Sequence, residues 1–358
     1  MGNLTIISDK KSWDKVQQRL AAPSVLSDFS MVNAGTLLFP GDKAAAEAAL
    51  YEEGGECIFY PYLKRPCPYR SDMFDICSAY EFGGFWFSSD DEDKCSKLVQ
   101  GFEVAFREHA FKANIVSEFV RINPFCRISG LGWKDYELKQ VGQHIIIPTK
   151  SEELVWKEFH GSRRTQIRES QKEGLKIEFS NDARTFTEIY YKRLDALNSY
   201  KFYYFPEDYI ALLKDKKIIF ARDTKNEICG TQVYIKDNNI LFYFLSADVY
   251  EKRQVKPNGF IISEMVKWAC ANNIDYIHLG GGVASLHHYK SLFSPHRIDY
   301  FLAKRIVNQK AYDDLVKQHE KANGELQNKG YFPLYRLDTT VPNKLPEERR
   351  YTATQTIS

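Results

Sequence analysis

Apolar positions recur at two spacings along this chain, and the change from one spacing to the other marks the predicted helices and strands. Spacings of three and four residues indicate helices that bury one face, whereas short apolar runs between polar residues indicate strands. The elements predicted for the first part of the chain are helices at 12–21 and 93–111, strands at 37–39, 57–60 and 115–122, and an extended loop through the prolines of 61–68.

The pattern restarts near residue 150. Ser151 can cap a helix whose first turn carries Glu152 and Glu153, so a domain boundary is expected here. That helix is predicted to run in pieces to Lys172 and to stop at Gly174. The elements expected after it are a helix through 186–194, an antiparallel meander of strands at 217–222, 228–235 and 240–245 with a turn at 237–239, a helix at 260–272, a strand at 298–306 and a helix at 309–323.

Residues 276–282 form a short apolar strand that runs into Gly280, Gly281 and Gly282. Glycine adopts positive φ and lets a ligand approach the backbone closely. α/β proteins often build a pocket at the carboxyl end of such a strand. A basic and aromatic segment at 285–293, which includes Lys290, follows the glycines. The pattern therefore predicts a binding site at this strand end.

The composition is that of a globular chain of about two domains, since 44% of the 358 residues are hydrophobic and 27% are charged. A net charge of +2 argues against DNA as a partner and leaves only a local basic patch open. The amino-terminal residues lack the apolar region of a signal peptide, so a cytoplasmic protein is expected. The seven cysteines form no CxxC pair, which predicts reduced thiols and no metal site.

The order of these elements and a set of short motifs resemble those of the Fem-type peptidyltransferases and of their relatives in surface-polysaccharide gene clusters. These enzymes are similar to the GNAT acyltransferases. The motifs cover most of residues 25–336. They are 80–84, Arg163 with Arg164 and Arg168, 193–195, 203–205, Pro257 with Asn258, 279–282, 285–286, 289–290, 293–294 and 332–336.

The resemblance implies an α/β (α+β) fold of two tandem GNAT-like domains, each a mixed, mostly antiparallel sheet flanked by helices. The first domain is expected at 1–149 and the second, which carries the main cleft, at 150–308. Residues 309–340 are expected to pack back on the first domain, and 341–358 to form a disordered tail.

The same resemblance implies an acyltransferase. Its donor would be aminoacyl-tRNA, and its acceptor an amine of a bacterial cell-envelope precursor, in peptidoglycan or surface polysaccharide. A lipid-linked acceptor would bring the protein close to the membrane. Two alternatives stay open: an acyl-CoA-dependent N-acyltransferase that acts on an amino sugar with acetyl-CoA or another acyl-CoA, and a non-catalytic binding scaffold of the same fold. Pro257 interrupts the loop 253–259 and removes an N–H group from it, which argues against acetyl-CoA bound in the usual GNAT manner.

Acyl transfer to an amine requires a deprotonated nucleophile and a stabilised oxyanion. Lys290 is the first candidate to neutralise negative charge, and the alternative is a solvated helix lysine. The other catalytic candidates are Arg193, Asp195 and His278, for which an ion pair or core packing is the alternative. The substrate-binding candidates are Tyr80, Gly83, Gly84, Arg164, Arg168, Tyr203, Tyr204, Asn258, Gly280, Gly281 and Gly282. The arginines could instead form a solvated basic face, and the tyrosines could fill a domain interface.

Overall fold

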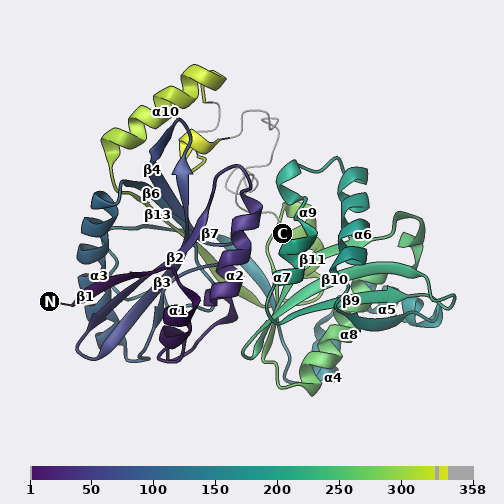
Figure 1. Ribbon diagram of the computed structural model, residues 1–358. Helices are drawn as coiled ribbons and strands as arrows, with labels where there is room; N and C mark the ends of the chain where they lie inside the picture. The colour runs from purple at the N-terminus through teal and green to yellow at the C-terminus, as the bar shows by residue number, and fades with distance from the viewer. Residues whose placement is uncertain (1, 327–329, 338–358) are drawn as a thin grey trace. The chain divides into compact units, whose positions relative to one another are not determined.

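The computed structural model describes residues 2–326 and 330–337, so the tail expected at 341–358 lies outside the described residues. The chain forms two compact units (Figure 1). Of the described residues, the first comprises 2–142, 299–326 and 330–337, and the second comprises 143–298.

The first unit is built on a mostly antiparallel sheet in the order β1-β2-β3-β4-β6-β13, with the short β5 paired to β3. Within this order β4 and β6 run parallel. The strands are β1 (Asn3–Ile7), β2 (Ala45–Glu53), β3 (Glu56–Cys67), β4 (Arg70–Cys77), β5 (Trp86–Phe87), β6 (Ile115–Arg121) and β13 (Arg297–Ile306). The helices are α1 (Lys10–Gln17), α2 (Phe29–Ala34), α3 (Glu92–Lys112) and α10 (Gln309–Asn323), with 3-10 turns η1 (Val25–Ser27), η2 (Gly35–Leu38) and η5 (Leu334–Arg336).

Helix α3 supplies much of the core of the first unit. It begins at Asp91, whose side chain accepts a hydrogen bond from the backbone N–H of Lys94 at 2.9 Å. Phe102 and Phe106 lie one turn apart, stack with ring centroids 5.2 Å apart, and both pack edge-on against Tyr60 of β3. The apolar residues that recur at helical spacing in the sequence therefore lie on one buried face of α3.

Two expectations for the first unit are wrong. Residues 37–39 are not a strand, because Leu37 and Leu38 complete the 3-10 turn η2 that follows α2. The prolines of 61–68 do not force a loop, because β3 runs through most of them. Pro66 lies at a register shift against β4, a kind of position where a strand tolerates a missing N–H group.

The segment after α10 contacts the first unit through η5. The hydroxyl groups of Tyr335 and Ser117 are 2.7 Å apart, and Tyr335 is fully buried. Arg336 pairs with Asp75 of β4 and, at 2.7 Å, with Asp42. These contacts join residues more than 200 positions apart in the sequence.

The second unit has a sheet in the order β7-β12-β11-β10-β9-β8, in which β11 and β12 run parallel and the other pairs antiparallel. The strands are β7 (Glu137–Pro148), β8 (Lys176–Ser180), β9 (Lys216–Arg222), β10 (Ile228–Asp237), β11 (Ile240–Asp248) and β12 (Tyr276–Gly280). The helices are α4 (Glu152–Glu158), α5 (Gly161–Lys172), α6 (Ala183–Ala196), α7 (Glu207–Leu212), α8 (Pro257–Ala271) and α9 (Ala284–Ser291), with 3-10 turns η3 (Lys201–Tyr203) and η4 (Tyr250–Val255).

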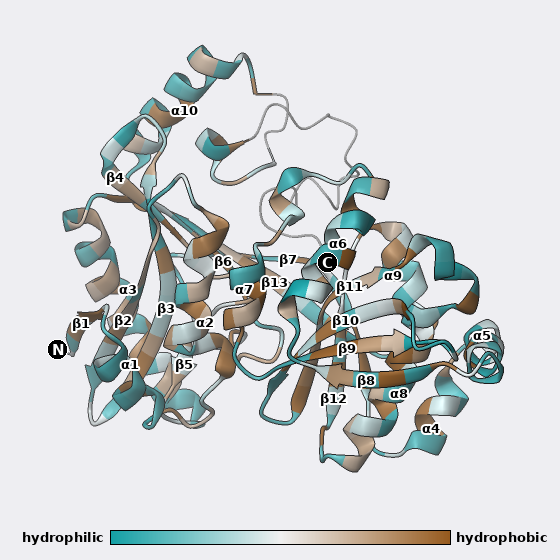
Figure 2. Ribbon diagram, turned by 45° about the vertical axis from the view of Figure 1, so that its right-hand side comes forward, coloured by the Kyte–Doolittle hydropathy of each residue, from teal (hydrophilic) through white to brown (hydrophobic). Residues whose placement is uncertain are grey.

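Helices cover both faces of this second sheet. On one face α8 packs its apolar residues, among them Ile261 and Met265, in a core cluster that includes Tyr243 of β11. On the other face Tyr209 of α7 packs against Phe244, the next residue of β11. Figure 2 shows α5 as a largely hydrophilic helix, in keeping with the few buried residues that it contributes.

The predicted fold class is confirmed in each unit: a mixed, mostly antiparallel sheet flanked by helices. The predicted meander is β9, β10 and β11, with Asn238 of its second turn at a φ of 52°. Within the described residues, none of the helices combines the length and hydrophobicity that a bilayer crossing requires.

Candidate functional site

In the second unit, β11 and β12 part from each other midway along β11. Their parallel pairing runs from Ile240 and Tyr276 to Phe242 and His278, whereas β11 continues to Asp248. The carboxyl half of β11 and the glycine turn after β12 therefore flank a split in the sheet. Ligands of open α/β sheets bind at strand ends of this kind, so this split is the candidate active site.

The glycine turn needs glycine at each of its three positions. Gly280 has a φ of 75° and Gly282 a φ of 128°, a region that other residues rarely adopt. Gly281 is required for a different reason, because a Cβ atom there would lie 2.8 Å from Cδ2 of His144. The turn thus packs directly on a histidine of β7.

Lys290 is buried on α9, with 1% of its surface exposed, so it is not the solvated helix lysine of the alternative interpretation. Its Nζ donates a hydrogen bond to the Gly281 carbonyl at 2.8 Å and lies 5.2 Å from the centre of the Tyr243 ring. The ammonium group is therefore held between the glycine turn and the carboxyl half of β11.

His278 packs beneath the turn and forms a pair with His144. Nε2 of His278 and Nδ1 of His144 are 3.0 Å apart, so one ring donates and the other accepts. Burial first, and the positive charge of Lys290 second, lower the pKa of His278 to about 3. Burial first, and His278 and Lys290 after it, hold the pKa of His144 well below its usual range. Both rings are therefore neutral at pH 7, beside a cation.

Arg193 and Asp195 do not pair with each other. Nε of Arg193 lies 2.8 Å from a carboxylate oxygen of Asp248, at the end of β11, and Arg253 approaches the other oxygen at 3.3 Å. Asp195 is exposed and accepts a hydrogen bond from the hydroxyl of Tyr204 at 2.6 Å. Asp248 thus joins two arginines at the end of β11, whereas Asp195 lies in a separate surface contact.

Helix α8 begins at Pro257, which corrects the interpretation of this residue. Pro257 is not inside a loop but at the first helical position, where the missing N–H group has no intrahelical partner to lose. The next residue, Asn258, accepts a hydrogen bond through its carbonyl from Nε2 of Gln232 at 2.9 Å. The proline therefore gives no argument against a ligand at this helix start.

The three arginines of α5 have three different environments and do not form one basic face. Arg163 stacks on Tyr289 of α9 at 4.3 Å. Arg164 donates to the carbonyl of Lys157 at 2.9 Å and so caps the end of α4. Arg168 is exposed and lies 5.5 Å from the ring of Trp156. Only Arg163 contacts the segment that carries Lys290.

The remaining substrate-binding candidates have other neighbours. Tyr203 is buried and packs edge-on against Phe202, with ring centroids 5.7 Å apart. Tyr80, Gly83 and Gly84 belong to the first unit, where the ring of Tyr80 faces the guanidinium of Arg121 at 5.0 Å.

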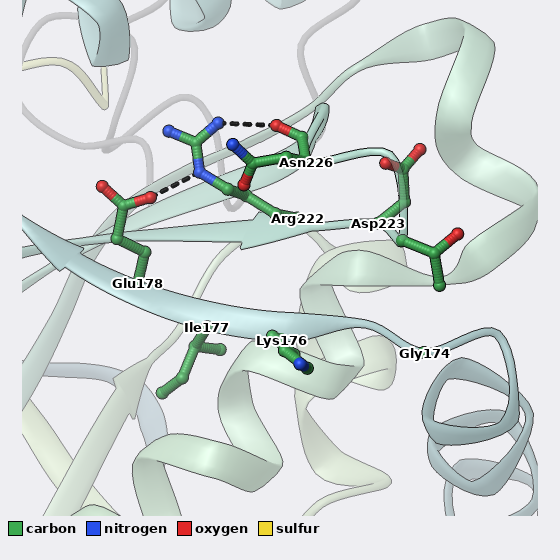
Figure 3. Close-up of a pocket in the computed structure, with 8 residues that line it drawn as sticks. Gly174, Lys176, Ile177, Glu178, Arg222, Asp223 and Asn226 are labelled. Atoms are coloured by element: carbon green, nitrogen blue, oxygen red, sulfur yellow. Dashed lines mark hydrogen bonds and ion pairs between the residues drawn. The ribbon is translucent and has the colours of Figure 1, made fainter.

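A surface hollow of about 410 Å³ lies in the second unit between β8 and the turn after β9. Figure 3 shows Arg222 there, bonded to the side chain of Glu178 and to the backbone carbonyl of Asn226. Arg222 and Glu178 of its lining form an ion pair, and none of the sequence-predicted candidates lines the hollow. Among the residues that the structure describes, no group of three or more His, Cys, Asp or Glu side chains is placed to hold a metal ion.

Sequence reasoning missed three residues of the split: His144, Tyr243 and Asp248. His144 precedes three isoleucines in a strand, a place where a lone polar residue signals a buried partner. Tyr243 and Asp248 lie on β11 beyond the point where its pairing with β12 ends. The sequence does not show where that pairing ends, so it could not identify these two residues.

No family model and no curated protein matches this chain. Solved structures do resemble it. FemX superimposes with a TM-score of 0.65 at 13% identity, over 87% of this chain and 99% of FemX. A conserved protein of unknown function from Bacteroides thetaiotaomicron gives 0.52 at 8% identity, over 85% of this chain and all of that one. The C-terminal domain of a putative lysylphosphatidylglycerol synthetase from Agrobacterium fabrum gives 0.50 at 15% identity, over 83% and 93%. The chain therefore has the fold of FemX.

Proposed function

We propose that this protein is a Fem-like acyltransferase that moves an aminoacyl or other acyl group to an amine of a bacterial cell-envelope precursor. The observation that carries the proposal is the buried Lys290 ammonium, fixed on the Gly281 carbonyl where β11 and β12 part. The Fem-type fold supports the reaction class.

In the proposed reaction the neutral acceptor amine attacks the carbonyl carbon of the acyl donor. The new C–N bond forms while the carbonyl oxygen takes up negative charge, and the bond to the leaving oxygen or sulfur then breaks. The proton lost by the amine passes to the leaving group. Lys290 would stabilise the developing negative charge, and the protein around it is water-poor, so the stabilisation exceeds that in solution.

The neutral histidine pair has a supporting role in this scheme. His144 holds Gly281 by direct packing, and His278 holds His144 by the hydrogen bond between their rings. Both rings are buried, so the proposal assigns the proton transfer to the substrates and not to His278. At the end of β11 the two arginines on Asp248 would contribute positive charge for an acidic substrate group.

The donor is the open part of the proposal. Aminoacyl-tRNA is the donor that the resemblance implies, and acyl-CoA with an amino-sugar acceptor is the second candidate. The second stays open because Pro257 occupies the first helical position of α8, where its missing N–H group costs nothing. A helix start of this kind can bind phosphate.

The test is transfer of labelled acyl groups by the purified full-length protein. Charged tRNA and acetyl-CoA serve as donors, each offered with nucleotide-linked and lipid-linked envelope precursors. We expect transfer from one donor, and we expect Lys290→Met to lower kcat by about 10²- to 10³-fold. Lys267→Met is the matched control, because Lys267 pairs on the surface of α8 with Glu264.

The outcomes separate the candidate functions. Transfer from acetyl-CoA alone would replace aminoacyl-tRNA by acyl-CoA as the donor. A complete lack of transfer from both donors to every acceptor would contradict the proposal of an acyltransferase. The non-catalytic binding scaffold would then be the remaining candidate function. A Lys290→Met protein that melts like the wild type and retains full activity would remove Lys290 from the mechanism.

A further inference from the structure

A second strand end, in the first unit, resembles the split in the second unit. There β4 and β6 run parallel, β4 ends at Cys77, and β6 continues to Arg121. The loop that follows β4 lies on this strand end, because the N–H group of Gly83 donates to the Arg121 carbonyl at 2.7 Å. The loop also contains Tyr80 and Glu81, so polar groups gather at this position.

Arg121 is buried at this strand end, with 4% of its surface exposed. Its Nη2 donates to the carbonyl of Ala79 at 3.2 Å, and the ring of Tyr80 faces the guanidinium. Its other two nitrogens, Nε and Nη1, are buried and have no hydrogen-bond partner among the described residues.

Two other buried arginines of the same unit show the usual arrangement. Arg65, 4% exposed, donates through Nε and Nη2 to Asp75 at 3.0 and 2.8 Å. Arg305, 5% exposed, forms an ion pair with Glu118, although its Nη1 and Nη2 are also buried without a hydrogen-bond partner among the described residues. Arg121 forms no ion pair with a carboxylate of the described residues. Buried donors without an acceptor are unfavourable, so the hydrogen bonding of Arg121 is incomplete as it stands.

Aromatic side chains and one carboxylate surround Arg121. The pKa of the Tyr300 hydroxyl is raised, mainly by burial. The charge of Arg121 lowers this pKa and the charge of Glu81 raises it, so both side chains lie close to the hydroxyl. Tyr300 itself packs against Phe82 of the loop, with ring centroids 5.8 Å apart. A ligand group that reaches Arg121 therefore meets aromatic rings on its sides and one buried carboxylate nearby. The unpartnered guanidinium nitrogens of Arg121 favour an acidic ligand group over a neutral one, because an ionised acceptor forms the stronger hydrogen bonds.

We propose that Arg121 is the anchor of a second binding site, in the first unit, which takes a carboxylate or phosphate group through the guanidinium nitrogens that the chain leaves without a partner. Such a group accepts charge-assisted hydrogen bonds from arginine, which are about twice as strong as neutral ones. Because Arg121 is buried, the acidic group enters with a shift of the loop at 78–84. The site does not depend on the transferase reaction, but under the proposed function it would bind an acidic part of the acceptor.

The test observes the arginine itself. In full-length protein labelled with ¹⁵N in arginine, the guanidinium signals of Arg121 are assigned by their loss in Arg121→Lys. Inorganic phosphate and acetate are then titrated separately at constant ionic strength. We expect a saturable change of the Arg121 signals with one of the two anions and no change for Arg65, whose Nε and Nη2 already donate to Asp75. The responding anion distinguishes a phosphate from a carboxylate ligand.

Hydrogen exchange adds a second measurement, since the bound anion should slow exchange of backbone N–H groups in 78–84 in wild type and not in Arg121→Gln. Arg121 signals that change with neither anion, together with unchanged exchange in the loop, would overturn the proposal. Water or a rotated Glu81 would then complete the pocket. Because neither measurement requires turnover, this result would leave the acyltransferase proposal intact, and the reverse also holds.

Discussion

The histidine pair makes the stability of the second unit depend on pH. In the unfolded chain each ring has an ordinary pKa near 6.5, whereas in the folded protein the pKa of His278 is about 3 and that of His144 is also lowered. Above pH 6.5 both states are neutral and the stability is complete. Below it the unfolded chain binds protons that the folded protein does not, so stability falls as the pH falls from 6.5 towards 3.

We expect the free energy of unfolding to decrease by about 1.4 kcal/mol per pH unit below pH 6 for each histidine that stays neutral. His278→Gln keeps a side-chain amide near the position of Nε2 and removes one titrating ring, so its decrease should be smaller. Urea unfolding at pH 7, 6 and 5 measures this. His288→Gln, at an exposed position on α9, is the control, and an equal slope in wild type and His278→Gln would contradict the assignment.

Gly281 offers a second test at the scale of single residues. Gly281→Ala should destabilise the protein by about 1–3 kcal/mol, because the new Cβ would lie 2.8 Å from the His144 ring. The double variant with His144→Ala should recover part of that loss, since the ring is gone. A double-mutant cycle by thermal unfolding measures the coupling, and strictly additive effects would mean that the ring is not the obstacle.

Single-residue motifs in the sequence pointed to the glycine turn and Lys290, but the environment of these residues could not be predicted. The hydrogen bond between His144 and His278 joins residues 134 positions apart. An ion pair was the alternative interpretation of Arg193 and Asp195, yet the carboxylate partner of Arg193 is Asp248 on strand β11. Side-chain partners of this kind follow from the sheet order and not from local spacing.

Among the elements, α4 starts where its cap predicts. The hydroxyl of Ser151 accepts a hydrogen bond from the backbone N–H of Leu154 at 3.2 Å, and Glu152 and Glu153 occupy the first turn. We expect Ser151→Ala to reduce the free energy of unfolding by about 1 kcal/mol, because the N–H group loses its acceptor. Ser151→Asp, which keeps an acceptor, should stay close to the wild type in urea unfolding. Equal losses in both variants would show that the cap is not the cause.

Elements with a clear period or a clear end signal were predictable, and short apolar runs were not. The helix at 309–323 matches α10, because an amphipathic pattern extends over four turns. The run Leu37-Leu38-Phe39 contains too few residues to show a period. Its two leucines belong to the 3-10 turn η2 that follows α2. Strand β3 tolerates its prolines for two reasons that the sequence does not show. Its pairing with β4 shifts register at Pro66, and on the same edge it pairs first with β5 and then with β4.

At the scale of the whole chain, the first unit is closed by residues that follow the second unit. Strand β13 pairs with β6, and its Arg305 forms a buried ion pair with Glu118, 187 positions earlier. The sequence pattern predicted the strand at 298–306 but assigned it to the second domain, since chain order was the only guide available. In the structure the first compact unit resumes at Asp299, within β13.

This closure can be tested with Arg305→Met. The substitution leaves the Glu118 carboxylate buried with the hydroxyl of Tyr136, at 2.8 Å, but without its cation. We expect a loss of about 3–5 kcal/mol in the free energy of unfolding, and a smaller loss in the double variant Glu118→Leu with Arg305→Met, because neither charge then remains buried alone. Hydrogen exchange in urea assigns the loss to a unit: exchange should accelerate in β6 and stay unchanged in α8. A wild-type rate in β6 would mean that β13 does not hold the first unit together through this pair.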